Sequence, residues 1–180
     1  EIFNLVFPEF KNIYRLKNFM LFSNRIKKSE ILLLSILLVD LKGNHEYFCH
    51  KYKVSNKIRD HLNLIGSYFK DSKIDKEFFK KRLKSNLYNI GIDNFKILFC
   101  LNLLDKKTIL AKDSDFFKAI DKISIPKFPF DGNFLLKKGI QEGRKIGTIL
   151  EEAEKHWARN NYNLSVKDFE TIIKKNTISN

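Results

Sequence analysis

The sequence has little of several things that would point to a secreted or membrane protein. Its two cysteines, Cys49 and Cys100, are too few for a disulfide framework, and no signal peptide opens the chain. Its most apolar run, residues 31–39, is interrupted by Ser35 and is about half of the ~20 residues that a membrane-spanning helix needs. We therefore expect a cytoplasmic protein in a reducing compartment, with no transmembrane segment and no membrane partner.

Acidic residues are few beside the basic ones. The chain has 34 Lys and Arg against 21 Asp and Glu, a formal net charge of +13. Such a charge attracts polyanions, nucleic acid first among them. Only six of the basic residues are Arg, while Asn, Ile and Phe are plentiful, which is also typical of an AT-rich coding sequence that drifts toward Lys. Both explanations of the charge stay open at this point.

The two-residue alternation that is typical of strands is lacking. Apolar residues recur three and four positions apart, which indicates amphipathic helices. We predict an all-α fold, a multi-helix bundle body followed by a small helical tail subdomain. The expected helices follow Ser29 and the apolar run after it, then cover 55–70, 75–91, 94–104, 114–123, a short stretch at Leu135 and Leu136, 143–160, and a last segment capped by Ser165.

Proline is also scarce, and its placement divides the chain. Pro126 and Pro129 are two of only three prolines, and they bracket a segment that cannot continue a helix. We place a domain boundary here. The predicted domains are a helical body over 1–124 and a helical tail with spaced glycines over 125–180.

The tail and two upstream segments carry a family resemblance. The stretch from Pro126 to Trp157 resembles the tail signature of bacterial class II CCA-adding tRNA nucleotidyltransferases and their poly(A) polymerase relatives, with a proline-bearing lead, spaced glycines and a helix that ends near an aromatic residue. The matching positions are Pro126, Pro129, Gly132, Leu135, Leu136, Gly139, Ile140, Gly143, Ile146, Gly147, Leu150 and Trp157.

Two segments of the body extend the resemblance over nearly the whole chain. LVFPEF resembles the family's opening of the helical body, and KVSNKIRDHLNL resembles a later body segment. The matches there are Pro8, Glu9, Val54, Ser55, Asn56 and Leu62. The chain departs from the family pattern at Phe134, where Asp is frequent, and at Arg144, where Pro is frequent.

The resemblance implies a role in tRNA processing. A body and tail of this kind hold the acceptor arm and elbow of tRNA, while an N-terminal catalytic head, not contained in this chain, adds C, C and A from CTP and ATP with Mg²⁺. The parent would thus be a transferase that performs CCA addition. We expect this chain alone to be inactive, with no catalytic residue, metal or cofactor of its own. The alternatives are the same region of a poly(A) polymerase and a non-catalytic helical module that binds RNA or protein.

Two groups of residues are the predicted RNA contacts. Arg144 and Lys145 follow Gly143 at a helix start, where unpaired N–H groups and the helix dipole favour a phosphate. The second group combines four cations in the body, for which backbone contact is expected. Its members are Lys80, Lys81, Arg82 and Lys84. For both groups, a merely solvated surface is the alternative.

The glycines of the tail have a conformational or steric reason. Gly139 can take the left-handed conformation that closes a helix, and Gly143 can start the next helix. Gly147 lies one turn inside that helix, where glycine is roughly 1 kcal/mol less favourable than alanine. We favour close packing of a neighbouring helix as its reason over close approach of an RNA backbone. The predicted buried stripe of this helix consists of Ile146, Leu150, Ala153 and Trp157.

The carboxylates that nucleotidyl transfer needs are not recognisable. Asp113 with Asp115, and Asp71 with Asp75, are closely spaced, but we interpret them as helix caps. The segment HEYFCH begins at His45 and has Cys where the zinc-protease motif H-E-x-x-H has its second His, so we expect no zinc there.

Overall fold

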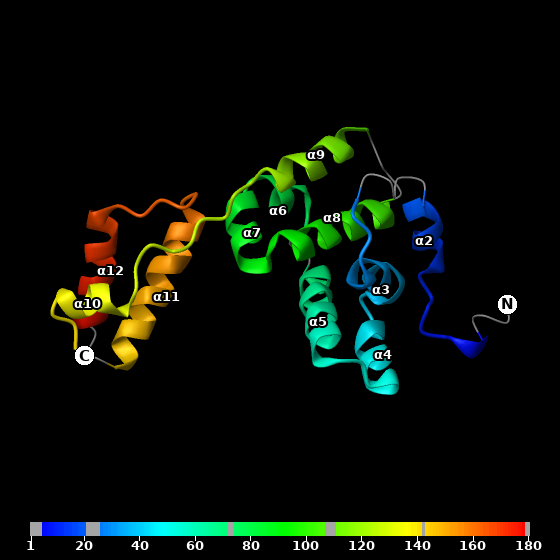
Figure 1. Cartoon of the computed structure of the whole chain (residues 1–180), viewed down its shortest axis with the longest axis horizontal. Coiled ribbons are helices and arrows are strands. Elements are labelled where there is room, and N and C mark those ends of the chain that lie inside the picture. Colours follow the sequence, from blue (N-terminus) through cyan, green and yellow to red (C-terminus); the bar gives the residue numbers. More distant parts are fainter. Residues whose placement is uncertain (1–4, 21–25, 72–73, 107–110, 142, 179–180) are drawn as a thin grey trace. The chain divides into compact units, whose positions relative to one another are not determined.

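The computed structural model describes residues 5–20, 26–71, 74–106, 111–141 and 143–178. Within these ranges the regular structure is helical and no strand occurs, so the predicted all-α fold is confirmed (Figure 1). The helices are α2 (Ile13–Met20), α3 (Glu30–Leu38), α4 (Asn44–Tyr52), α5 (Asn56–Lys70), α6 (Lys76–Lys80), α7 (Leu83–Ile90), α8 (Ile92–Lys106), α9 (Ala111–Asp121), α10 (Gly132–Lys137), α11 (Arg144–Arg159) and α12 (Val166–Ile178).

The chain divides into two compact units. The first comprises Glu1–Lys81 and Ile90–Ile123, and the second comprises Arg82–Asn89 and Ser124–Asn180. Nearly all of α7 therefore belongs with the C-terminal helices. None of the helices within the described ranges is long and apolar enough to cross a membrane.

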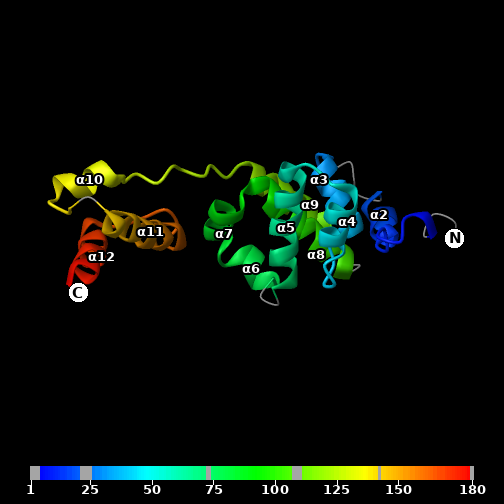
Figure 2. The ribbon, with the colours of Figure 1, turned by 90° about the horizontal axis from the view of Figure 1, so that it is seen from below.

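Helix α3 lies at the centre of the first unit. It packs against α2, α4, α5 and α8 (Figure 2), and Leu32, Ile36 and Leu38 are fully or almost fully buried. Its start is capped as predicted, because the Ser29 hydroxyl accepts a hydrogen bond from the N–H of Leu32. The prediction of a capped helix buried within the bundle is confirmed.

A buried arginine fixes α2, a helix that the sequence analysis did not predict. Arg15 is 3% exposed, and its guanidinium donates to Asp105 on α8 at 2.7 Å and to the carbonyl of Val39 at 2.6 Å. A buried cation needs such partners, since losing one leaves its charge uncompensated. Long-range contacts of this kind stabilise α2.

The two cysteines of this unit do not form a disulfide bond. Cys49 and Cys100 are both free and buried. Burial raises the pKa of both thiols, that of Cys100 to about 12. Both side chains act as small apolar groups in the core.

The single helix expected over 75–91 is wrong, because a turn separates α6 from α7. Its predicted cap is confirmed, since Asp75 accepts hydrogen bonds from two N–H groups of the first turn. Phe79 in α6 packs against Phe95 of the first unit with ring centroids 5.4 Å apart, whereas Tyr88 in α7 contacts Trp157 of the second unit at 5.2 Å. One straight helix cannot bury its apolar face in two separate cores, so it breaks.

The proline-bearing connector forms part of the core of the second unit. Phe130 and Phe134 pack against Phe169 of α12 with ring centroids 4.5 and 5.5 Å apart, and Phe128 contacts Trp157 of α11 at 5.4 Å. Phe134, one of the two departures from the family pattern, is therefore a packing residue here. Phe128 and Phe130 of the connector pack against the core that α10, α11 and α12 form.

The buried face of α11 differs from the predicted stripe by one position. Ala153 and Trp157 are buried as predicted, but Ile149 is 1% exposed while Ile146 and Leu150 are half-buried. The stripe is centred on Ile149 because α10 and α12 both pack on this face. Wide apolar faces of this kind are typical of helices that contact two neighbours.

Candidate nucleic-acid interface

The start of α11 is an exposed and uncapped helix terminus. Gly143 occupies the N-cap position with φ 139° and ψ −164°, a conformation that is essentially restricted to glycine. It has no side chain to bond the first-turn N–H groups, and no acidic residue lies in that turn. Arg144 and Lys145 follow it, and both are exposed. The positive end of a 16-residue helix thus coincides with two cations.

Gly147 continues this surface. No described atom outside its own helix backbone lies within 4 Å of a Cβ built on it, and the residue is exposed. The favoured explanation, close packing of a neighbouring helix, is therefore wrong. Gly147 is two residues from the buried Ile149, which places it on the opposite face of α11. The space over Gly147 allows another molecule to approach the helix backbone closely.

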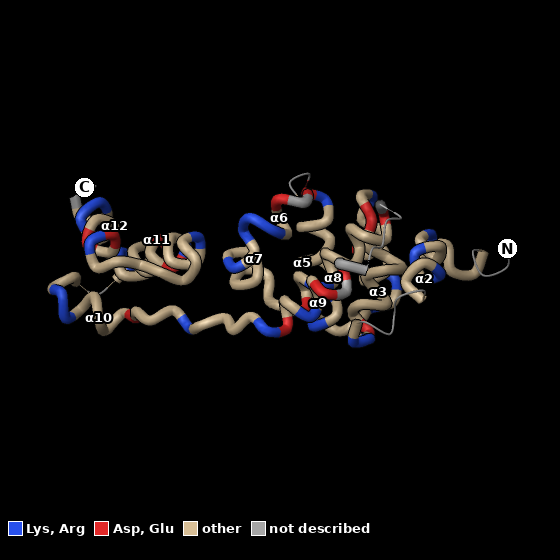
Figure 3. Tube along the Cα trace, turned by 90° about the horizontal axis from the view of Figure 1, so that it is seen from above, with Lys and Arg blue, Asp and Glu red and all other residues tan. Residues whose placement is uncertain are grey.

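The end of α10 adds two cations to the same stretch of chain. Gly139 has φ 82°, and the hydrogen bonds from its N–H to Leu136 and from the N–H of Ile140 to Leu135 form a Schellman motif, which confirms its predicted helix-ending role. Lys137 and Lys138 lie just before it and are exposed. Figure 3 shows this basic stretch at the end of α10. Glu142, between the two helices, lies outside the described residues.

The sequence analysis missed these two lysines, although a local signal was present. Lys138 approaches Glu170 of α12 at 3.9 Å, but both side chains are about half exposed, and such a pair contributes little. Basic residues in the last turn of a helix also interact favourably with the helix dipole. Taken by themselves, the two lysines are therefore explained by a structural role. The signal that identifies them is their position in the sequence, directly before Gly139 and shortly before Arg144.

The second predicted group does not form one helix face. Lys80 ends α6, Lys81 forms an ion pair with Glu77 at 2.5 Å, and the division between the two units falls after Lys81. The Lys84 carbonyl accepts a hydrogen bond from the Tyr162 hydroxyl at 2.7 Å. Arg82 is exposed, directly precedes α7 in the sequence, and belongs with it to the second unit. A role of these residues in RNA binding stays a prediction, now for two separate surfaces.

The described residues contain no group of three or more His, Cys, Asp or Glu side chains that could hold a metal ion. Asp113 and Asp115 lie inside α9, so their interpretation as caps is wrong, whereas Asp71 does end α5. His45 is 1% exposed, and its Nδ1 has no hydrogen-bond partner among the residues that the structure describes.

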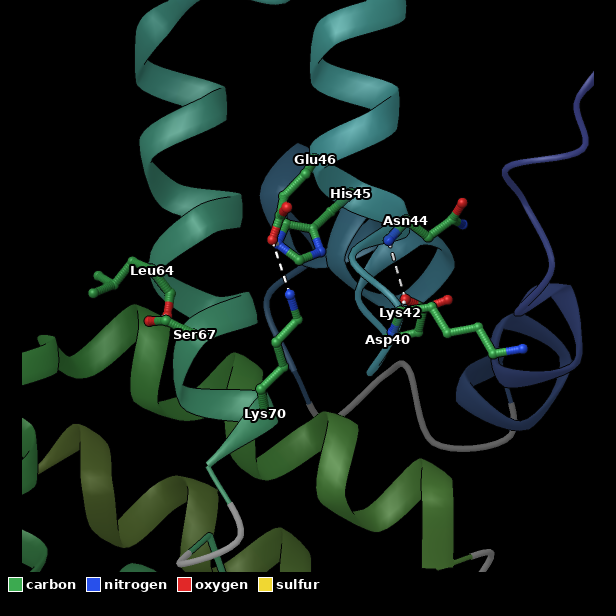
Figure 4. Close-up of polar contacts among 8 residues, drawn as sticks. All are labelled: Asp40, Lys42, Asn44, His45, Glu46, Leu64, Ser67 and Lys70. Atoms are coloured by element: carbon green, nitrogen blue, oxygen red, sulfur yellow. Dashed lines mark hydrogen bonds and ion pairs between the residues drawn. The ribbon is translucent and has the colours of Figure 1, made fainter.

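The surroundings of His45 are structural. Burial lowers the pKa of its imidazole, and the nearby Lys70 ammonium lowers it further, against the opposing effect of Glu46 and Asp40. Figure 4 shows the ring near Glu46, whose carboxylate binds Lys70 at 2.9 Å and thus ties α4 to α5. This arrangement stabilises a helix pair.

Comparison with known proteins gives partial matches. No family model matches the chain. It is 33% identical over 58 residues to human "CCA tRNA nucleotidyltransferase 1, mitochondrial", a match that covers 32% of this chain and 13% of the relative. The mouse protein of the same name is 31% identical over 58 residues and the zebrafish protein 41% identical over 51 residues, which cover 13% and 12% of those relatives.

These matches span only a small part of each relative, and they concern animal mitochondrial proteins. The predicted assignment to the bacterial class II group therefore stays a prediction. At the coarser level, a region of this chain is similar to a region of CCA tRNA nucleotidyltransferases.

Proposed function

We propose that this chain is the tRNA-binding C-terminal portion of a CCA-adding enzyme, with a body over 1–124 and a tail over 125–180 that hold the acceptor arm and elbow of tRNA. The observation that carries the proposal is the similarity to proteins named CCA tRNA nucleotidyltransferase. Nucleotide transfer from CTP and ATP with Mg²⁺ is assigned to a catalytic head outside these residues. The net charge of +13 supports a polyanionic partner.

The start of α11 supplies the proposed contact with the tRNA backbone. A phosphate oxygen placed there accepts hydrogen bonds from the first-turn N–H groups that have no helical partner. Arg144 binds such a phosphate through two parallel hydrogen bonds, and Lys145 adds a second charge. Because Gly147 has no side chain, the sugar-phosphate backbone can pass close to the helix. A rigid helix end of this kind reads shape and phosphate spacing, as recognition of double-helical RNA requires.

Two other functions remain as alternatives, and different measurements separate them. A poly(A) polymerase parent is implied equally by the resemblance, but the similarity to proteins named CCA tRNA nucleotidyltransferase favours CCA addition. A helical protein-interaction module whose charge results from coding drift predicts weak RNA binding without preference for structure. We also propose a cytosolic location, supported by the two free cysteines, with the mitochondrion of the relatives' names as the alternative.

Filter binding of the purified chain to tRNA tests the proposal. We expect tRNA to bind more tightly than an unstructured single strand of equal length, with affinity that falls steeply between roughly 50 and 200 mM salt. Equal affinity for the two RNAs would favour the interaction module. In the same preparation we expect no nucleotide incorporation with CTP, ATP and Mg²⁺, and addition above a heat-killed control would contradict the assignment of catalysis elsewhere.

A further inference from the structure

The first unit contains a pocket that the proposed tRNA contact does not use. It has a volume of about 610 Å³ and lies between the segment before α3 and helices α3, α5, α8 and α9. Small-molecule sites in proteins have volumes of roughly 300 to 1,000 Å³. The pocket is therefore large enough for a ligand of the size of a nucleotide.

One part of the pocket attracts an anion. Lys27 and Lys57 line it, both are exposed, and neither forms an ion pair with another described residue. The third lysine of the lining, Lys96, is already paired with Asp121. Lys27 and Lys57 are thus the two cations of the lining that remain available for a bound phosphate.

The N-termini of three helices add to the positive potential of the pocket. The lining includes Ser29 at the N-cap of α3, Lys57 in the first turn of α5, and Asp93 in the first turn of α8. Three helices thus begin at the same pocket, and the N-terminus of each carries a partial positive charge. The helix ends support the two lysines, which remain the principal anion-binding groups.

A second part of the pocket accepts hydrogen bonds. The Asn94 side chain donates its Nδ2–H to the Ile90 carbonyl, so its Oδ1 faces Nδ1 of His61 at 3.1 Å. Because an amide oxygen only accepts, Nδ1 of His61 carries the proton, and in the neutral ring Nε2 is an acceptor. Asp93 adds a carboxylate for which no partner is recorded within the described part of the chain. These acceptors suit the hydroxyl or amino groups of a ligand.

The third part of the pocket is apolar. Ile31, Leu32 and Ile97 line it together with the aromatic side chain of Phe117. Apolar side chains and an aromatic ring are the usual contacts of a nucleobase.

We propose that this pocket binds a nucleoside monophosphate unit. The phosphate contacts Lys27 and Lys57, the ribose hydroxyls or base amino group donate to His61 and Asp93, and the base packs on the apolar wall. Inorganic phosphate satisfies only the first contact, and a nucleoside only the other two. The inference rests on the pocket alone and does not depend on tRNA binding by the tail.

NMR titration of the ¹⁵N-labelled full chain with AMP tests this inference, with adenosine and inorganic phosphate as comparison ligands. We expect shift changes confined to the pocket, and tighter binding of AMP than of either comparison ligand. Lys57→Ala should weaken AMP binding by about tenfold, as expected for loss of one charge-assisted hydrogen bond. The control Lys118→Ala removes an exposed cation of α9 that does not line the pocket and should leave the affinity unchanged.

A second variant tests the acceptor part independently. His61→Ala should weaken AMP and adenosine but leave inorganic phosphate unaffected. An equal loss of AMP binding in Lys57→Ala and Lys118→Ala, or no AMP binding at millimolar concentration, would overturn the proposal. Displacement of AMP by a 5′-phosphorylated oligonucleotide would support the site with an RNA end as its ligand. Retention of AMP against that oligonucleotide would support it with a free nucleotide.

Discussion

Two glycines inside helices of this protein have opposite surroundings. Gly66 in α5 is buried, and a Cβ built on it would lie 2.2 Å from Nε2 of His45 on α4. Gly147 in α11 is exposed, and the same construction meets nothing within 4 Å among the described residues. Glycine is unfavourable inside a helix, so each position wants a reason. The first has its reason within the chain, whereas for the second no described residue supplies one.

The largest expected effect distinguishes the two glycines by stability. Gly66→Ala places a methyl group against the buried His45 ring, and we expect the free energy of unfolding to fall by roughly 1 to 3 kcal/mol, the range for overpacked cores. Urea unfolding followed by circular dichroism measures this. A change within the error of wild type would show that the α4–α5 contact adjusts freely.

A double-mutant cycle sharpens the same point. His45→Ala removes the ring that an added methyl group would meet, so the two substitutions together should destabilise less than the sum of the single effects. Strict additivity would mean that the loss in Gly66→Ala arises elsewhere in α5.

The next effect is a pH dependence that arises from His45 in the α4–α5 region. The pKa of His45 is lowered from 6.5 by burial, so the unfolded chain binds more protons than the folded one below that pH. The associated stability is complete above about pH 6.5 and is lost as the pH falls toward the lower folded-state pKa, with a slope of up to about 1.4 kcal/mol per pH unit.

Urea unfolding at a series of pH values from neutral to mildly acidic measures this slope. His45→Gln should remove it. His50→Gln, on the exposed side of the same helix, is the matched control and should retain it. Equal slopes in both variants would assign the acid sensitivity to other groups.

Some helix ends of this protein are predictable from the local sequence, whereas other features of the fold are not. Ser29, Ser55 and Gly139 have local signals whose consequence is confined to a few residues, so the helix ends there are confirmed. The turn between α6 and α7 depends on the contact of Tyr88 with Trp157, which are distant in the sequence, and no local pattern announces it. Helix α2 was not predicted, although its apolar residues recur with helical spacing.

The sequence predicts the position of the candidate site, but not the reason for a glycine at position 147. The residue types at 143–147 indicate an uncapped basic helix start, and the structure has one. What lies beside Gly147 depends on how the other helices of the second unit pack, which periodicity does not specify. The expected neighbouring helix is absent within the described residues, and this difference is the reason for assigning the position to a partner.

A smaller effect on stability should accompany a loss of binding at the second glycine. Because Gly147 is exposed and inside a helix, Gly147→Ala should raise the free energy of unfolding by about 0.5 to 1 kcal/mol. The added methyl group should also weaken tRNA binding, since it occupies the space proposed for the RNA backbone. Urea unfolding and filter binding of the same preparation measure both. A stabilised variant with unchanged tRNA affinity would show that Gly147 is not part of the tRNA interface.

The most direct test of the central claim is the salt dependence of tRNA binding by the double variant Arg144→Ala/Lys145→Ala. Stability should hardly change, because both side chains are exposed. The matched control, Arg159→Ala/Lys167→Ala, removes two exposed cations at the other end of α11 and the start of α12. If each of the first pair contacts one phosphate, the slope of log affinity against log salt should shrink by roughly 1.4 to 1.8, while the control stays near wild type. An unchanged slope in Arg144→Ala/Lys145→Ala, or an equal reduction in both variants, would contradict a phosphate site at the start of α11.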